Sequence, residues 1–199
     1  MNATVDLSGH FLMAMPGSVE GDLAGTVIYV CEHSDQGALG LVINRPMDLT
    51  ISHLLQKVDL EAPDAQESAD QIESDSKDSS DFPVFYGGPV QTDRGFVLHK
   101  PAGEFTSSIH LGKSMALTTS KDVLQAVAGG EGPEQILVTL GYAGWGAGQL
   151  EQELAQNAWL SVAAEETIIF DEPPESRYPA AMRLLGIDPA MLAGSAGHA

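Results

Sequence analysis

An arginine and a histidine lie close together in the stretch Phe85 to His99, which reads FYGGPVQTDRGFVLH. Two apolar runs flank a segment rich in turn residues, so the pattern predicts a strand, a tight loop and a second strand. Arg94 would lie between Asp93 and Gly95 in that loop, where a guanidinium could bind an acidic group. Because the chain has only nine Lys and Arg residues, an arginine held in a turn is a better site candidate than one on a solvated helix face.

A second candidate is the sequence Cys31-Glu32-His33, at the end of the apolar run TVIYVC. Side chains two residues apart on a strand project to the same face, so an imidazolium at His33 could lower the pKa of the Cys31 thiol. Such a pair would make a thiolate nucleophile or a redox sensor, with His33 or His99 as the base. The alternative is that Cys31 packs in the core, since free cysteine is among the most buried residue types.

Standard motifs for phosphate, metal and acyl chemistry are missing from the sequence. Gly112-Lys113-Ser114 resembles the end of a P-loop, but Ser107 stands where the motif needs its first glycine. The segment Gly141 to Glu153 follows a predicted strand and opens a helix, yet Gln149 replaces the last glycine of a dinucleotide-binding motif. The six histidines and one cysteine form no cluster at metal-ligand spacing, and no G-x-S-x-G elbow occurs. We therefore predict no metal site and no cofactor, and we assign no catalytic residue.

The order of the predicted elements favours an α+β fold. Strand patterns outnumber strand-helix-strand units, which indicates a twisted, mixed and mainly antiparallel sheet with helices packed around it. A polar turn between the first two strand runs predicts a hairpin. Thr50 and Ser120 precede apolar residues at helical spacing, and Pro179 is expected to begin a helix that stops at Gly186. The expected strands are 26–31, 38–44, 95–99, 107–111, 115–118, 136–140, 160–163 and 167–170, and the other expected helices are 51–58, 121–128 and 149–157.

The negative charge of the chain is concentrated in one segment. The 199 residues carry a net charge of −19, and the stretch between Asp59 and Asp81 holds nine acids and one lysine. This stretch is rich in serine and poor in apolar residues, so it cannot bury enough apolar surface to offset the entropy of ordering it. We predict one domain over residues 1–199, with a flexible acidic insertion at about 61–81 and a frayed tail after residue 192. A docking role for the acidic insertion is the alternative.

Composition also bounds the class of protein. Hydrophobic residues make up 43% of the chain, enough for one sizeable core. No apolar run approaches the roughly 20 residues of a membrane span, and no basic segment precedes the first apolar run. The single cysteine excludes an intramolecular disulfide. We expect a soluble, cytoplasmic protein of bacterial type that does not associate with membranes.

Four blocks of the sequence resemble the bacterial YqgE/AlgH family. The match covers most of the chain outside the acidic insertion and the tail. The resemblance implies an α+β fold with a mixed sheet, a cytoplasmic location and a role in transcriptional regulation, which is attached to the family through a member linked to alginate. It transfers no catalytic residues, because the family has no established reaction. The blocks are GHFLMAMPG (9–17), VIYVCEHSDQGALGLVINRP (27–46), FYGGPVQTDRGFVLH (85–99) and LGYAGWGAGQLEQEL (140–154).

Direct binding to DNA does not fit the charge of this chain. Neutralisation of phosphates supplies much of the affinity of DNA-binding proteins, which therefore display a basic patch. Here nine basic residues are scattered among twenty-eight acids, and no predicted helix carries several of them. We expect any regulatory role to act through an unknown protein partner or a small ligand.

Two functional hypotheses follow, beside the possibility that the same residues serve only the fold. In the first, the protein is a binding module whose arginines recognise an acidic group, while an aromatic side chain supplies apolar contact and amides add hydrogen bonds. In the second, it is a thiol-dependent enzyme or redox sensor based on Cys31. The predicted binding patch comprises Asn44, Arg45, Pro46, Gly87, Gly88, Pro89, Arg94, Trp145, Gln149 and Asn157.

Overall fold

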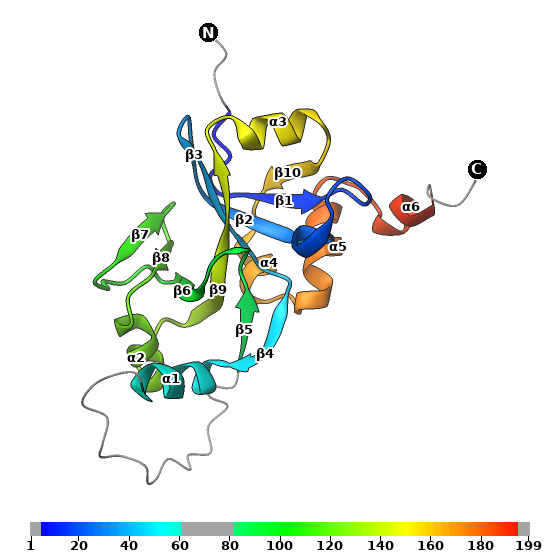
Figure 1. The fold of residues 1–199 in the computed structure, drawn as a ribbon. Coiled ribbons are helices and arrows are strands. Elements are labelled where there is room, and N and C mark those ends of the chain that lie inside the picture. Colours follow the sequence, from blue (N-terminus) through cyan, green and yellow to red (C-terminus); the bar gives the residue numbers. More distant parts are fainter. Residues whose placement is uncertain (1–4, 61–81, 195–199) are drawn as a thin grey trace.

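A single curled sheet organises the protein (Figure 1). The computed structural model describes residues 5–60 and 82–194, and within them ten strands pair in the order β10-β1-β2-β3-β9-β6-β8-β7, with β5 joined to β9 and β4 joined to β5. Every pair is antiparallel except that of β5 with β9, so the predicted α+β fold with a mixed, mainly antiparallel sheet is confirmed. The strands are β1 (His10–Ala14), β2 (Val27–Ser34), β3 (Gly37–Val42), β4 (Pro46–Thr50), β5 (Pro83–Tyr86), β6 (Val90–Lys100), β7 (Ser108–Leu111), β8 (Met115–Thr118), β9 (Gln135–Gly146) and β10 (Trp159–Ala163).

The hairpin of β2 and β3 forms as the sequence predicts, but with a bulge. Val30 lies opposite Gly40, and Glu32 lies opposite Leu39, so Cys31 is the extra residue of the bulged strand. A bulge shifts the alternation of side chains between the two faces of a sheet. The face on which His33 lies is therefore not the face that simple alternation predicts.

Strand β9 joins the two halves of the sheet. Its C-terminal part pairs with β3, and its N-terminal part pairs with β6 and with β5. The sequence predicts a strand over 136–140 followed by a glycine-rich loop, which is wrong, because the strand continues through Gly146.

The connection from β5 to β6 crosses β9 with the two backbones in contact. A Cβ atom on Gly88 would lie 2.1 Å from the carbonyl carbon of Tyr142. Glycine allows this close approach and also the positive φ of +152° at Gly88.

The stretch Phe85 to His99 differs from the predicted strand, loop and strand. The loop contains only Gly87, Gly88 and Pro89, and the segment with Arg94 belongs to β6, where its pairing with β9 shifts between Val90 and Gly95. β5 and β6 do not pair with each other, since each pairs with β9. Arg94 therefore extends from a strand and not from a tight turn.

Helices cover the sheet and two of them correct the sequence analysis. The predicted strand at 167–170 is helix α4, which the bond from Asp171 N–H to the Thr167 carbonyl oxygen (2.9 Å) closes. Its apolar residues point into the core. Burial of these side chains in the helical conformation outweighs the strand propensity of the β-branched residues. The helix predicted to begin at Pro179 begins at Pro174 and contains Pro179. The helices are α1 (Ile51–Leu60), α2 (Asp122–Ala128), α3 (Gln149–Ala155), α4 (Glu166–Phe170), α5 (Pro174–Leu184) and α6 (Pro189–Gly194), besides the short 3-10 helix η1 (Gly21–Leu23).

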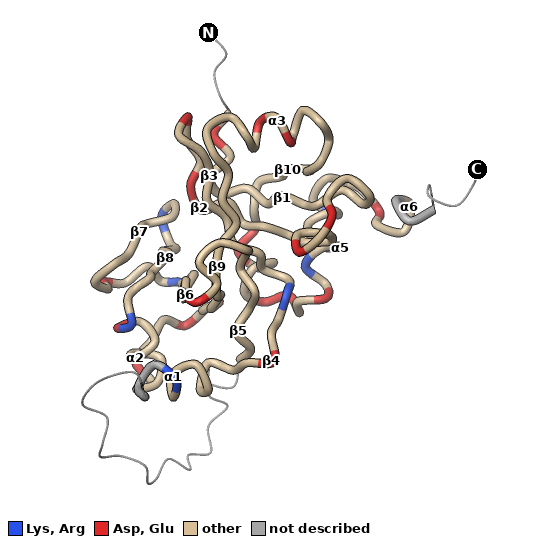
Figure 2. The backbone as a smooth tube through the Cα atoms, in the orientation of Figure 1, with Lys and Arg blue, Asp and Glu red and all other residues tan. Residues whose placement is uncertain are grey.

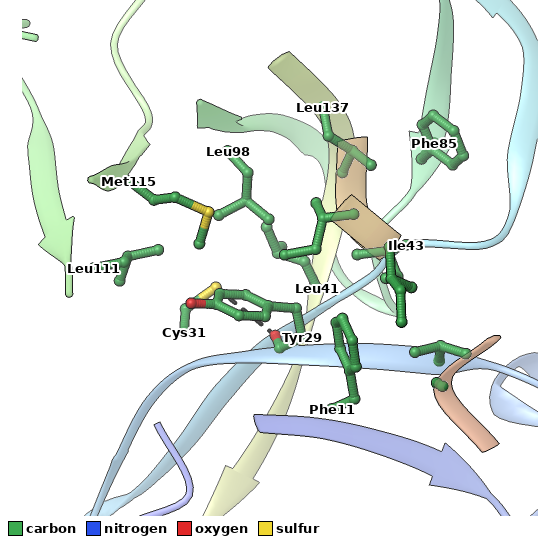
Figure 3. Packing of buried hydrophobic residues seen from close by; sticks show 14 of the residues in the cluster. Phe11, Tyr29, Cys31, Leu41, Ile43, Phe85, Leu98, Leu111, Met115 and Leu137 are labelled. Carbon is green, nitrogen blue, oxygen red and sulfur yellow. Dashed lines mark hydrogen bonds between the residues drawn. The ribbon is translucent and has the colours of Figure 1, made fainter. Parts of the chain in front are cut away.

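The core consists of three clusters of buried side chains. The first lies between the inner face of the curled sheet and helices α4 and α5, and it includes Phe11, Cys31, Leu98 and Met115 (Figure 3). The second lies beneath α3 and contains Trp145 and Trp159, and the third lies beneath α1 and α2. Among the described residues, no helix is long and apolar enough to span a membrane. The prediction of a flexible insertion at 61–81 lies outside the described residues, and so does the part of the predicted frayed tail after residue 194. Helix α6 extends to Gly194, two residues into that predicted tail.

Candidate functional site

A cavity of about 580 Å³ opens between β2, the β7–β8 hairpin and α4. Figure 3 shows part of its wall, with Tyr29 and Cys31 on one side and Leu111 and Met115 on the other. Large concave sites with apolar walls and a few polar groups are the usual places where proteins bind small molecules. The apolar wall consists of Tyr29, Ile109, Leu111, Met115, Ala164 and Ile169, and the polar groups belong to Ser8, Cys31, Glu32, His110, Lys113 and Glu166.

Cys31 is the sequence-predicted candidate that this cavity contains. Its side chain belongs to the first core cluster, and its thiol is placed to donate to the carbonyl oxygen of Tyr29 at 3.8 Å. Burial, with a smaller contribution from the neighbouring Glu32 carboxylate, raises the pKa of the Cys31 thiol well above its ordinary value. The thiol is therefore protonated at neutral pH, which is the opposite of what a nucleophile needs.

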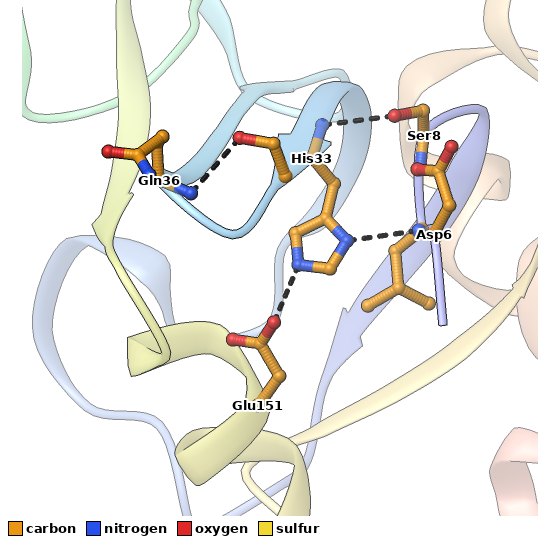
Figure 4. A network of polar contacts seen from close by, with 7 residues as sticks. Asp6, Ser8, His33, Gln36 and Glu151 are labelled. Atoms are coloured by element: carbon orange, nitrogen blue, oxygen red, sulfur yellow. Dashed lines mark hydrogen bonds and ion pairs between the residues drawn. The ribbon is translucent and has the colours of Figure 1, made fainter. Parts of the chain in front are cut away.

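His33 does not assist Cys31, because the bulge at Cys31 turns it toward α3 (Figure 4). The backbone N–H of Leu7 donates to His33 Nδ1 at 3.1 Å, so that nitrogen carries no proton. The other nitrogen, Nε2, then donates to Glu151 Oε1 at 2.9 Å. Through these two hydrogen bonds, His33 fastens the N-terminal segment to α3. The predicted projection of Cys31 and His33 to one face is wrong.

His99 is enclosed in a network of its own. Its side chain is fully buried, Nδ1 donates to the Pro101 carbonyl oxygen at 2.9 Å, and Nε2 accepts from the Thr118 hydroxyl at 2.7 Å. Ser108 in turn lies 2.6 Å from the Thr118 hydroxyl, which accepts its proton. Burial lowers the pKa of His99 below its ordinary value, so the ring is neutral at pH 7. These contacts fasten β6 to β8 and leave no nitrogen for a substrate.

The charged groups of the cavity divide into a paired and an unpaired set. Glu166 accepts hydrogen bonds from Lys100 Nζ and from the Ser114 hydroxyl, at 2.6 Å for the latter. The bond from Lys100, followed by that from Ser114, lowers the pKa of the Glu166 carboxyl. Lys113, in the turn between β7 and β8, forms no ion pair with any described residue. Its ammonium group is exposed and free to meet a ligand.

The first part of the predicted binding patch holds two loops together. Asn44 accepts from the Val27 N–H at 2.9 Å and donates to the Gly25 carbonyl oxygen at 3.1 Å, while Arg45 donates to the Ala24 carbonyl oxygen. Both side chains therefore fix the segment that follows η1. The Tyr86 N–H donates to the Arg45 carbonyl oxygen at 2.8 Å, which places Asn44, Arg45 and Pro46 beside Gly87, Gly88 and Pro89.

Arg94 lies on the surface of β6. Its guanidinium stands over the Phe96 ring, 5.7 Å from the centroid, and has contacts of 3.4 Å with Gln91 and Thr119. The Phe96 ring meets Tyr142 of β9 edge to face at 5.4 Å. Trp145 lies three residues beyond Tyr142 on β9, so strand alternation places it on the opposite face.

Two of the remaining patch residues, Trp145 and Gln149, donate to Glu153 on α3. One carboxylate oxygen of Glu153 accepts from both indole N–H groups, at 2.9 Å from Trp145 and 2.8 Å from Trp159, and the other accepts from Gln149 at 3.0 Å. Trp145 is buried and packs edge to face on Trp159. Asn157 ends the segment after α3 with a positive φ of +58°. Trp145 thus has a packing role, on the face of β9 opposite the aromatic pair beside Arg94, whereas Gln149 and Asn157 are exposed.

Comparisons with known proteins agree with this architecture. The sequence profile of a family described as AlgH-like matches residues 11–190. The chain belongs to the AlgH-like family. A UPF0301 protein of Bordetella petrii is 64% identical over 194 residues, which cover 98% of this chain and 90% of the relative. A UPF0301 protein of Thiobacillus denitrificans is 55% identical over 195 residues and covers 98% of both chains.

Two solved structures share the fold of this AlgH-like chain. The solution structure of AlgH from Pseudomonas aeruginosa is 47% identical in sequence, with a TM-score of 0.77 over 100% of this chain and 99% of the other. A crystal structure from Corynebacterium diphtheriae has a TM-score of 0.65 at 18% identity and covers 92% of this chain and 89% of the other. The second likeness concerns the fold alone.

Sequence reasoning missed most of the residues that line the cavity of this AlgH-like protein. Tyr29 and Ile109 lie in predicted strands, but the pattern of a strand does not tell which strand ends face each other across a curled sheet. In the sequence, Lys113 stands out only as part of an incomplete P-loop motif. The signal that could have identified it is its position in a tight turn between two short predicted strands. The described residues contain no group of three or more His, Cys, Asp or Glu side chains that could hold a metal ion.

Proposed function

We propose that this AlgH-like protein is a regulatory binding module that takes a small organic molecule in the cavity between β2, the β7–β8 hairpin and α4. The ligand would have an apolar body and one anionic group. The observation that carries the proposal is the meeting of apolar walls with an unpaired ammonium group, that of Lys113, in one cavity of about 580 Å³. Burial of the apolar body supplies affinity, and the charge fixes the orientation of the ligand.

The charges around the cavity favour one orientation of this ligand. Lys100 and Ser114 already donate hydrogen bonds to the Glu166 carboxylate, and Lys100 balances its charge. A cationic group of the ligand would therefore gain little by binding beside Glu166. Glu32 lies at the rim beside Cys31 and would repel an anion there. The anionic group is therefore expected at the Lys113 end, with the apolar body directed toward Met115 and Ile169.

Binding fits this cavity better than thiol chemistry does. The Cys31 thiol is protonated, and the two histidines proposed as its base are engaged elsewhere. A thiolate-based enzyme would need a group that lowers the pKa of the thiol. In the binding module, Cys31 is a weakly polar part of the wall.

In the cytoplasm, a partner protein would bind the ligand-bound form in preference to the free form. The name AlgH of the solved relative agrees with a regulatory role, and direct contact with DNA is not needed for it. Figure 2 shows the Lys and Arg residues of the described chain spread over separate elements, with Asp and Glu residues between them along the backbone. The low positive charge argues for a protein partner, since a DNA-binding surface gains its affinity from clustered basic residues.

Titration with the fluorescent probe 8-anilinonaphthalene-1-sulfonate tests this proposal, because the probe combines an apolar body with one anionic group. We expect saturable binding to the folded protein, weakened about fivefold in Lys113→Gln, the factor expected when one partly exposed ion pair is lost. Lys121→Gln, at the start of α2 and outside the cavity, is the matched control and should bind like wild type.

A second pair of variants tests the apolar part of the same site. Ala164→Leu would fill the cavity and should abolish probe binding, whereas Ala163→Leu, its exposed neighbour outside the cavity, should not change it. The proposal is wrong if all four variants bind the probe as tightly as wild type, or if the two members of each pair lose affinity equally.

A further inference from the structure

A second cavity, of about 380 Å³, lies on another side of the molecule, between the beginnings of β5 and β9 and the loop from α4 to α5. Its walls are aromatic and proline side chains. Phe85 and Phe170 form the inner part, and Phe82, which is 58% exposed, extends the apolar surface outward. An apolar surface that continues beyond the cavity suits a chain segment better than a compact small molecule.

The rim of this cavity carries three carboxylates, those of Glu134, Asp171 and Glu172. None of them forms an ion pair with a described residue, although Asp171 accepts a hydrogen bond from Gln135 at 3.0 Å. The cavity is thus an apolar groove with an acidic rim.

The only cation among the lining residues, Arg177, is already used by the fold. It is 6% exposed, stands 5.0 Å from the centroid of the Phe85 ring, and donates to the carbonyl oxygens of Glu172 (2.9 Å) and Ile43. These contacts fix one aromatic wall and the α4–α5 loop, so the groove is formed before any partner arrives. A preformed groove lowers the entropy lost on binding.

We propose that this groove, defined by Phe82, Phe85, Phe170, Glu134, Asp171 and Glu172, docks an extended segment of a partner protein that alternates proline or aliphatic residues with Lys or Arg. Extended proline-rich segments bind aromatic-lined grooves with little loss of entropy. The three carboxylates, none of which forms an ion pair with a described residue, supply the charge complementarity that selects basic residues over acidic ones. The groove is separate from the cavity of the proposed function, and the two share no lining residue.

Fluorescence anisotropy with a labelled peptide of sequence PLPRPLR and the full chain tests this docking. We expect saturable binding that weakens as sodium chloride is raised from about 50 to about 500 mM, since salt screens exposed charges. The peptide PLPEPLE should not bind. The double variant Glu134→Gln/Asp171→Asn should weaken binding about tenfold, and Phe82→Ser about fivefold, as expected for lost rim charges and one lost aromatic contact.

The matched control is the double variant Glu131→Gln/Glu175→Gln, which changes the net charge equally at exposed positions outside the groove. It should bind PLPRPLR like wild type, and its unchanged affinity would support the groove. The proposal is overturned if the control double variant weakens binding as much as the groove variant, or if PLPEPLE binds equally well. Neither result depends on the probe titration of the first cavity.

Discussion

Glu153 joins the two tryptophans of the chain through one carboxylate oxygen. Like His33 and His99, it is a polar residue whose capacity for hydrogen bonds is used within the fold. Residue type singled out His33 and His99 as candidates for chemistry, but it could not tell a structural network from a site. The difference depends on long-range partners such as Glu151 for His33, which lies 118 residues away in the sequence.

Glu153→Gln should destabilise the fold by about 1 to 3 kcal/mol, because one amide oxygen cannot replace two carboxylate oxygens that accept three N–H groups. Glu151→Gln, on the same helix, should cost less than about 1 kcal/mol, since its amide oxygen can still accept from His33. Urea denaturation followed by tryptophan fluorescence measures both. Equal losses in the two variants would contradict the role assigned to Glu153.

His99 should make stability depend on pH. Its folded-state pKa lies below the ordinary value of 6.5, chiefly because burial disfavours the charged ring. Well above pH 6.5, the folded and the unfolded chain both leave this ring neutral, and its full contribution is present. As the pH falls below that value, the unfolded chain binds a proton that the folded chain does not, so the free energy of unfolding decreases.

The variant His99→Gln should therefore show a flatter dependence of stability on pH between about 7 and 5 than wild type does. The exposed His53→Gln, on α1 and away from His99, is the control and should keep the wild-type slope. Denaturation curves at a series of pH values provide the slopes. A wild-type slope in His99→Gln would show that another group causes the dependence.

At the scale of elements, β9 decides the architecture. The sequence predicted the β2–β3 hairpin, most strands and the helices α1, α2 and α3 because local patterns determine them. It did not predict the length of β9 or its pairing with three other strands, because such pairing depends on contacts distant in the sequence. Helix α4 was missed because a short apolar run does not distinguish a strand from a buried helix.

Gly88→Ala should destabilise the protein by about 3 kcal/mol or more, because its new Cβ atom would overlap the Tyr142 backbone where the β5–β6 loop crosses β9. Gly95→Ala lies in the same sequence block, but its Cβ atom would meet no atom within 4 Å. We expect its stability to stay within about 1 kcal/mol of wild type. Thermal and urea denaturation of both variants measure the difference, and a tolerated Gly88→Ala would contradict the close crossing.

For the whole molecule, the curled sheet leaves two hollows of different chemistry. One combines apolar walls with the unpaired Lys113, and the other combines aromatic walls with carboxylates that form no ion pair with a described residue. Neither could be predicted from sequence, because each is assembled from elements whose relative placement depends on β9. The predicted patch around Arg45, Arg94 and Trp145 relied on sequence blocks, and the structure distributes its members over separate contacts.

The most direct test of the proposed function is to map the binding of 8-anilinonaphthalene-1-sulfonate on the 15N-labelled protein by NMR chemical shifts. We predict that the largest shifts occur at the amides of residues 8–9, 31–32, 109–115 and 164–169, which surround the cavity of about 580 Å³. These shifts should decrease in Ala164→Leu. Shifts centred on Arg45, Gly88 and Trp145 would instead support the patch expected from the sequence. Shifts spread over the whole surface would contradict a specific site. Either result would refute the assignment of the cavity as the binding site.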